Sequence, residues 1–239
     1  MLDVPASIIP IMPLTPKPKP PVSVKLFSAD AIELLKTLGA SSVDLMIVDP
    51  AYESLEKHRK SGTTTRLKAR WFPVVKNSYF IEYFKESFRV MKNNTHTYCF
   101  CDQETMFHIV PMATKAGFHF WKPIVWDKMA ISTGYHWRNA YEFILFFEKG
   151  KRNLNNKSWC DIRHCKRLKG KQYYPTQKPV QLIHNLVLNS SNVGDIVLDP
   201  FMGAGSTGVA SVQLGRSFIG SDTEADAVAE ATLRIDKAR

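Results

Sequence analysis

The sequence predicts an α/β domain, with a mostly parallel sheet flanked by helices, and three observations favour this fold class. Short apolar runs alternate with segments whose apolar residues recur at helical spacing, which is typical of strands joined by crossover helices. The chain has 239 residues, 44% of them hydrophobic, which is enough for one domain with a substantial core. No internal repeat of about 20 to 50 residues is apparent, which argues against a solenoid or a propeller.

An extended arm is predicted for residues 1–21, because they hold half of the 14 prolines, which fit neither a helix interior nor a central strand. The domain itself is expected over residues 22–239. Its predicted elements, in order, are a helix over 30–38 capped by Ser28 or Asp30, a strand over 45–48, a helix marked by Phe80, Phe84, Phe88 and Met91, strands over 98–100, 124–126 and 143–147, and a helix marked by Val180, Ile183, Leu186 and Val187. A strand over 196–199, a Gly-rich turn, a helix over about 206–214 and a strand over 218–222 then form a complete βαβ unit.

The charge of the chain is strongly positive and clustered. Lys and Arg (32) exceed Asp and Glu (22) by ten, which makes a polyanion such as nucleic acid a reasonable partner. Basic runs occur at 57–70 and 149–171, inside predicted loops over 53–77 and 149–175 that exceed the usual length of a connection. Either run alone could equally be a solvated loop, but together they predict a phosphate-contacting face. The candidate DNA contacts are Lys57, Arg59, Lys60, Arg66, Lys68, Arg70, Lys151, Arg152, Arg163, Lys166 and Arg167.

Several classes of protein are disfavoured. The apolar runs are far shorter than the roughly 20 residues of a membrane-spanning helix, and the N-terminus lacks the features of a signal peptide, so a cytosolic protein is expected. Four cysteines are too few for a disulfide scaffold at this length. Cys160, His164 and Cys165 would supply only part of a zinc site, so ordinary thiols are favoured and no metal is expected.

The first of two motifs lies in the C-terminal βαβ unit and reads Asp199-Pro200-Phe201-Met202-Gly203-Ala204-Gly205-Ser206. Glycines at such a turn let a ligand approach the backbone, and the following helix points its free amides at that ligand. Asp222 ends the next strand, where a carboxylate can accept hydrogen bonds from both hydroxyls of a ribose. A Gly-x-Gly pair alone is often only a tight turn. The residues before it, Asp199-Pro200-Phe201, also differ from those of the Gly-x-Gly-x-x-Gly motif that binds dinucleotides. In this context the motif predicts a nucleoside-containing ligand.

The second motif, Asp49-Pro50-Ala51-Tyr52, follows a buried strand, at the end where open α/β sheets bind their ligands. In isolation it could be a simple Asp-Pro turn. The alternative is chemical, because the exocyclic amine of a nucleobase is a poor nucleophile whose lone pair is delocalised into the ring. A carboxylate and a backbone carbonyl that accept its two N–H bonds would localise that pair, and an aromatic ring would hold the base by stacking. Asp49, the Pro50 carbonyl and Tyr52 supply these groups.

The two motifs resemble the Asp-Pro-Pro-Tyr catalytic motif and the S-adenosylmethionine motif of amino-group DNA methyltransferases. Their order, with the catalytic motif first, is similar to the β-group of that family. Ala51 departs from the family pattern by replacing its second proline. Further segments that resemble the family are 30–38 with 42–45, 89–92 with 98–102, 126–128 with 141–143, and 175–179.

This resemblance implies a single Rossmann-like methyltransferase domain that uses S-adenosylmethionine. The cofactor-binding residues that it implies are Asp199 with Phe201, Gly203, Gly205 and Ser206 around the methionine part, Asp222 on the ribose, Asp30 at the adenine end and Lys178 on the carboxylate. For Lys178 and Asp30, a solvent-facing side chain is the alternative.

The activity that the resemblance implies is methylation of adenine N6 in double-stranded DNA. The target adenine would leave the duplex, stack on Tyr52 and present its amine to Asp49 and the Pro50 carbonyl. Asp at the first motif position resembles the adenine subgroup, while Ser is usual in cytosine-N4 enzymes. The alternatives are a cytosine-N4 methyltransferase, a non-catalytic DNA-binding or cofactor-sensing protein on the same fold, and a dehydrogenase, which the glycine spacing disfavours.

Target recognition is the least specified part of the prediction. The corresponding region of the family falls between Glu148 and Pro175, where only about 25 residues are present, so a short or relaxed recognition sequence is expected. Trp159 and Tyr173 are candidates to enter the duplex, with a place in the core as the alternative for both. Both basic runs are expected beside the base pocket. The resemblance further implies a cytoplasmic, nucleoid-associated enzyme of the restriction-modification type, encoded by a bacterium or a phage. Family members often form homodimers, but no segment identifies an interface.

Overall fold

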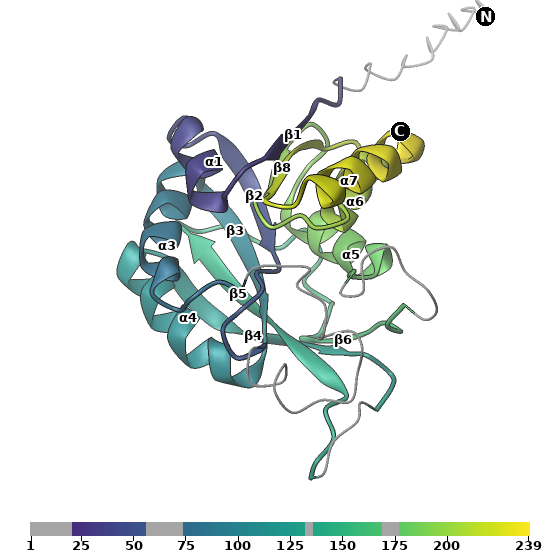
Figure 1. Cartoon of the computed structure of the whole chain (residues 1–239). Helices are drawn as coiled ribbons and strands as arrows, with labels where there is room; N and C mark the ends of the chain where they lie inside the picture. The colour runs from purple at the N-terminus through teal and green to yellow at the C-terminus, as the bar shows by residue number, and fades with distance from the viewer. Residues whose placement is uncertain (1–20, 56–73, 132–135, 169–176) are drawn as a thin grey trace, which may run out of the picture.

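The computed structural model describes residues 21–55, 74–131, 136–168 and 177–239 (Figure 1). Almost all of the predicted arm and the whole 57–70 basic run therefore lie outside the described residues, and so does Tyr173. None of the helices in the described ranges has the length and apolarity needed to cross a membrane.

Within the described residues, eight strands form one sheet in the order β1-β8-β7-β2-β3-β5-β4-β6. All neighbouring strands are parallel except β5, which runs antiparallel to both β3 and β4. This arrangement confirms the predicted α/β class. The strands are β1 (Val24–Ser28), β2 (Val43–Val48), β3 (Met91–Cys101), β4 (His119–Asp127), β5 (Tyr141–Lys149), β6 (Ile162–His164), β7 (Ile196–Asp199) and β8 (Ser217–Asp222).

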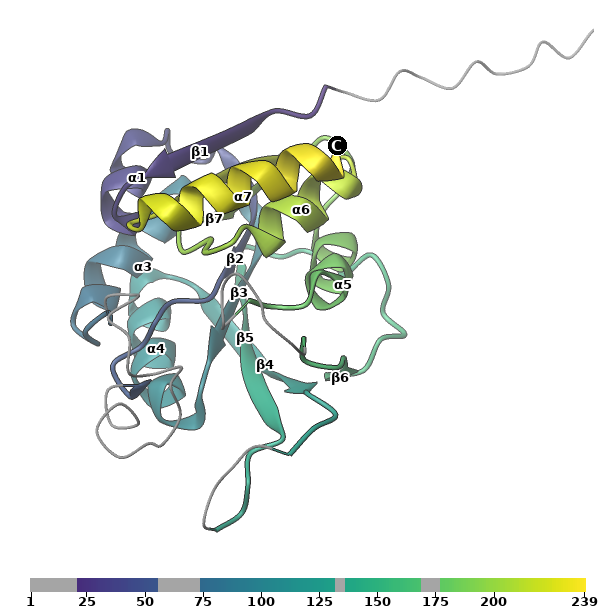
Figure 2. The ribbon, with the colours of Figure 1, turned by 45° about the vertical axis from the view of Figure 1, so that its right-hand side comes forward.

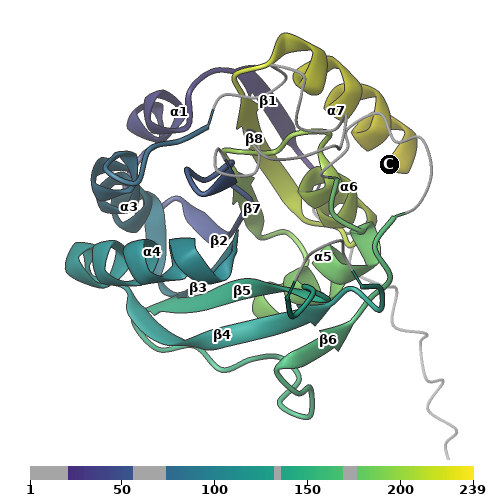
Figure 3. The ribbon, with the colours of Figure 1, turned by 60° about the horizontal axis from the view of Figure 1, so that its bottom comes forward.

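Helices cover both faces of the sheet (Figures 1 and 3). Helices α1, α3 and α4 pack on one face, and α5, α6 and α7 pack on the other, so the core is divided into two apolar clusters. The helices are α1 (Ala31–Thr37), α3 (Tyr79–Val90), α4 (Gln103–Ala116), α5 (Val180–Ser190), α6 (Ser206–Gln213) and α7 (Ala225–Ala238).

Local sequence accounts for the elements that were predicted. Helix α1 begins after Asp30, whose side chain accepts hydrogen bonds from the backbone N–H groups of Ile32 and Glu33, so Asp30 and not Ser28 is the cap. Strand β2 is apolar along nearly its whole length because helices cover both of its faces. Four elements, β1, α4, β6 and α7, were not predicted.

The sheet order positions the two motifs side by side. Strand β2 is paired with β7, and because the two are parallel, their carboxyl ends meet at one edge of the sheet. From β2 the chain continues through α3 to β3, whereas β7 continues through α6 on the opposite face to β8 (Figure 2). The edge between β2 and β7 is therefore a topological switch point, where α/β sheets bind ligands.

Candidate active site

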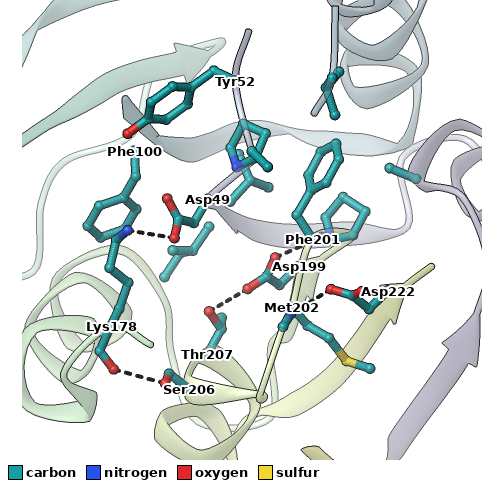
Figure 4. Close-up of a pocket in the computed structure, with 18 of the residues that line it drawn as sticks. Asp49, Tyr52, Phe100, Lys178, Asp199, Phe201, Met202, Ser206, Thr207 and Asp222 are labelled. Atoms are coloured by element: carbon teal, nitrogen blue, oxygen red, sulfur yellow. Dashed lines mark hydrogen bonds and ion pairs between the residues drawn. The ribbon is translucent and has the colours of Figure 1, made fainter. Parts of the chain in front are cut away.

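A cavity of about 780 Å³ opens at this edge, and nearly all of the predicted catalytic and cofactor-binding residues line it. Its volume lies within the usual range for small-ligand sites. The predicted residues that line it are Asp30, Asp49, Pro50, Tyr52, Lys178, Asp199, Phe201, Gly203, Ser206 and Asp222, and Figure 4 shows most of them pointing into one space. Gly205 is the one predicted cofactor residue that is not in its lining.

Asp49, directly after β2, is held by Lys178. The Lys178 Nζ lies 2.5 Å from Oδ2 of Asp49 and 2.9 Å from Oε1 of Glu142 on β5. Burial raises the pKa of Asp49, against the opposing effect of the Lys178 charge. Burial acts to lower the pKa of Lys178, but the carboxylates of Asp49 and Glu142 outweigh it, so the net shift of that pKa is upward. The side chain of Lys178 is only 12% exposed, which excludes the solvent-facing alternative.

The other residues of the Asp-Pro-Ala-Tyr motif line the same cavity. Tyr52 is buried beside the cavity, and it forms an isolated parallel bridge with Val75. The backbone N–H of Val75 donates a hydrogen bond to the Ala51 carbonyl at 2.7 Å. This bond supports the turn at the position where the family pattern has a second proline. The Pro50 carbonyl accepts no hydrogen bond from another described residue.

The buried carboxylate of Asp199 forms hydrogen bonds with other residues of the cofactor motif and of helix α6. It accepts hydrogen bonds from the backbone N–H of Phe201 at 3.1 Å and from the Thr207 hydroxyl at 2.6 Å. Burial raises the pKa of Asp199 to about 7. Asp199 therefore shapes the loop through contacts within the protein, and Thr207, in the first turn of α6, is a site residue that the sequence interpretation missed.

Asp222, at the end of β8, faces the same loop. Its Oδ2 accepts from the Gly203 N–H and its Oδ1 from the Glu224 N–H, each at 3.0 Å. The carboxylate lines the cavity and retains acceptor capacity, as a ribose partner requires.

The two glycines of the motif have different roles. Gly203, with φ of 49°, lines the cavity. Gly205, with φ of 75°, is turned towards α7, and a Cβ added there would lie 2.8 Å from Cβ of Ala231. Its N–H is also occupied, because it donates to the Met202 carbonyl at 2.8 Å. Gly205 thus permits α7 to pack on the loop, which differs from the expected place around the methionine part.

Asp30 is tied to a tyrosine that the sequence interpretation also missed. The hydroxyl of Tyr79 on α3 lies 2.8 Å from both carboxylate oxygens of Asp30. Burial and this hydrogen bond raise the pKa of Tyr79. The ring of Tyr79 lies 6.5 Å from that of Phe201, between centroids. Asp30, Tyr79 and Phe201 thereby form one end of the cavity.

Residues 169–171 of the 149–171 basic run lie outside the described residues, and of the rest only the later part lies beside the cavity, which corrects the prediction. Lys149 ends β5 and pairs with Thr95 in the first half of β3, so Lys151 and Arg152 follow at the end of the sheet opposite to the cavity. Lys149 is buried, and its Nζ donates to the carbonyls of Phe88 and Met91. The position of Lys151 and Arg152 could not be predicted from the sequence, because it depends on the antiparallel direction of β5.

The later part of the same run returns to the cavity edge along β6, which is parallel to β4. Lys166 and Arg167 are exposed there, and Arg167 lines the cavity. Arg163 is half-buried and stacks its guanidinium over the ring of Trp159, 4.7 Å from the centroid. Trp159 is also half-buried, so neither of this pair presents a free side chain.

Comparison with known proteins adds sequence and structural similarity to this geometry. Residues 43–233 match the family model N6_N4_Mtase, described as DNA methylase. The chain is 26% identical to the type II methyltransferase M.HinfI of Haemophilus influenzae, over 88% of this chain and 67% of that protein. It is 27% identical to the DNA adenine methyltransferase YhdJ of Escherichia coli (strain K12), over 89% and 83%. The crystal structure of the M1.HpyAVI-SAM complex has a TM-score of 0.65 at 25% identity, covering 88% of this chain and 99% of that one.

Proposed function

Because the chain belongs to the DNA methylase family N6_N4_Mtase, we propose that it transfers a methyl group from S-adenosylmethionine to the N6 amino group of adenine in double-stranded DNA. One observation carries the proposal: the same cavity is lined by Asp49-Pro50-Ala51-Tyr52, by the glycine loop and by Asp222, the carboxylate proposed to bind the ribose. A cofactor and a target base can therefore meet in it.

The residues at the β7 end of the cavity fit S-adenosylmethionine by their chemistry. Asp222 offers carboxylate oxygens to the ribose hydroxyls, and Phe201 offers an aromatic wall beside Tyr79. Asp30 and Tyr79 supply polar atoms at the end proposed for the adenine. When bound, the cofactor supplies an activated methyl group on a sulfonium, so the protein contributes mainly proximity and orientation.

The residues at the β2 end are proposed to receive the target base. Asp49 and the Pro50 carbonyl each accept a hydrogen bond from one N–H group of the amine, which leaves the lone pair of its nitrogen directed at the methyl group. Tyr52 stacks on the base after it has left the duplex. Asp49 is the proposed acceptor of the proton that the amine loses after transfer, because its carboxylate can be protonated whereas the Pro50 carbonyl cannot.

Adenine is the proposed target because Asp stands at the first motif position and because YhdJ, one of the similar proteins, is a DNA adenine methyltransferase. The family name covers N4 as well as N6 amino groups, so methylation of cytosine N4 is the second candidate. For the DNA surface, the exposed Lys166 and Arg167 at the cavity edge are the proposed phosphate contacts among the described residues.

Transfer of a labelled methyl group from S-adenosylmethionine to duplex DNA tests this function. Asp49→Ala is expected to abolish transfer while the dissociation constant for S-adenosylmethionine, measured by calorimetry, changes little. Asp161→Ala is the matched control, because Asp161 is an exposed aspartate that also pairs with a lysine, Lys122, away from the motifs. Unchanged transfer by Asp49→Ala would refute the role of this carboxylate.

A further inference from the structure

Four residues of alternating charge, beginning with Asp49 of the catalytic motif, line the cavity. Asp49 follows β2, Lys178 precedes α5, Glu142 lies on β5 and Lys128 follows β4. The Lys178 Nζ bridges Asp49 and Glu142, and the Lys128 Nζ lies 2.9 Å from the second oxygen of Glu142. Two cations and two anions balance, which is the arrangement that lets charged groups be tolerated with little solvent around them.

The two oxygens of the Asp49 carboxylate are not equivalent in this row. Oδ2 accepts the hydrogen bond from Lys178, whereas Oδ1 accepts none from a described residue (Figure 4). The hydrogen bond to Lys178 favours one orientation of the carboxylate. We propose that Lys178 is a positioning residue, held in place by Glu142, that anchors Oδ2 of Asp49 and thereby presents Oδ1 to the target amine; this inference rests on the proposed function.

Lys178 is itself fixed from several sides. Its carbonyl accepts a hydrogen bond from the Ser206 hydroxyl at 2.9 Å, which ties its backbone to the first residue of α6. Its ammonium lies 5.0 Å from the centroid of the Phe100 ring. One residue therefore joins the cofactor motif, through its backbone, to the catalytic motif, through its side chain. Loss of this support would misplace Asp49 relative to the methyl donor, and misplacement by about 1 Å can cost on the order of 10²-fold in rate.

Because of Glu142, Lys178 pairs with two carboxylates, those of Glu142 and Asp49. Its side chain is 11% exposed, and burial acts to raise its pKa, but Lys178 and Lys128 outweigh burial, so the net shift is downward. Glu142 therefore remains an anion and competes with Asp49 for Lys178. The consequence is that Lys178 lowers the pKa of Asp49 whereas Glu142 raises it. Removal of either partner should move the pKa of Asp49, and in opposite directions.

The other groups around Asp49 do not account for opposite shifts of its pKa on removal of Lys178 and of Glu142. Burial raises the pKa values of Tyr52, Cys99 and Cys101, so these groups stay neutral in acid. The pKa of Asp199 lies in the accessible range, but the charges that act on it are those of Asp49 and Asp222. The titratable groups facing Asp49 from its neighbouring elements are thus Lys178, Glu142, Lys128, Tyr52, Cys99, Cys101 and Asp199.

The experiment compares the full-length wild-type protein with Lys178→Met, Lys178→Arg and Glu142→Gln. Single-turnover methyl transfer at saturating cofactor and DNA is measured as a function of pH. Lys178→Met is expected to lower the saturated rate by on the order of 10²-fold and to move the acid limb of the profile to higher pH. Lys178→Arg keeps a cation and should recover part of the rate. Glu142→Gln, a near-isosteric change that keeps Lys178, should move the acid limb to lower pH. Lys122→Met removes an exposed lysine and serves as the control.

A second readout does not depend on activity. Carbon-13 NMR of labelled aspartate carboxyls, with the Asp49 signal assigned from Asp49→Asn, should show the pKa of Asp49 higher in Lys178→Met and lower in Glu142→Gln. The inference is overturned if Lys178→Met only weakens cofactor binding and leaves the saturated rate within about threefold, or if Glu142→Gln does not lower the pKa of Asp49. Absence of methyl transfer by the wild type would instead refute the proposed function, while the NMR titration would still test the pairing.

Discussion

Gly205→Ala should destabilise the fold, even though the new side chain would not enter the cavity. At φ of 75°, Gly205 has a left-handed backbone, and an added Cβ would lie 2.8 Å from Cβ and 3.1 Å from Cα of Ala231 on α7. Backbone atoms cannot be displaced by a rotamer change, so α7 itself must move. Arg234 on the same helix donates to the Ala204 carbonyl, so any movement of α7 is transmitted to the cofactor loop.

The magnitude follows from two costs and one gain. The left-handed conformation costs an alanine about 1–2 kcal/mol. Overpacking against α7 adds about 1–3 kcal/mol. The lower entropy of the unfolded alanine chain returns about 0.4–1 kcal/mol. The expected net decrease in unfolding free energy is therefore about 1–5 kcal/mol.

Urea unfolding followed by circular dichroism measures this change. Gly39→Ala is the matched control, because nothing lies within 4 Å of a Cβ added there, and its stability should stay within about 0.5 kcal/mol of wild type. If Gly205→Ala unfolded within that same margin, the close approach of α7 would not be the reason for this glycine.

The site leads to three more expected outcomes. Tyr52→Ala should weaken binding of the flipped base by about 1–3 kcal/mol, seen as a higher KM for DNA, whereas Tyr52→Phe should retain the stacking; equal effects of both changes would contradict a stacking role. Neutralising Lys166 and Arg167 together should reduce the slope of log Kd for DNA against log salt by about 0.9 for each phosphate that these side chains neutralise, whereas Lys151→Met, at the opposite end of the sheet, should leave the slope unchanged. The raised pKa of Asp199 means that its contribution to stability is full below about pH 4 and is lost as the pH rises through about 7; Asp199→Asn should remove this dependence, and an unchanged unfolding free energy between pH 5 and pH 8 in the wild type would contradict it.

The elements that the sequence predicted are those with strong apolar patterns. Strand β2 and helix α5 carry such patterns, and both were found within a few residues of their predicted positions. Helix α7 is buried through Ala227, Ala231 and Ile235, and two alanines give little hydrophobic periodicity. Helix α4 has a proline in its interior, and strand β1 has no fully buried residue because it lies at the edge of the sheet. Those elements are stabilised by neighbours that the sequence does not reveal.

The candidate site was predicted where its residues are consecutive and missed where they are not. Asp49 and Asp222 could be found from motifs next to strand ends. Lys128 and Glu142 fell inside segments that were matched to the family, but their pairing depends on the adjacency of β4 and β5. The direction of β5, which carries Lys151 away from the cavity, depends on the same pairing. Long-range strand order, rather than local pattern, determines both features.

The identity of the methylated base decides whether the proposed reaction is correct. Duplex DNA that carries no prior methylation is incubated with the protein and S-adenosylmethionine, digested to nucleosides and analysed by mass spectrometry. We expect N6-methyladenine, and we expect its formation to depend on Asp49. Formation of N4-methylcytosine without N6-methyladenine would contradict the proposal.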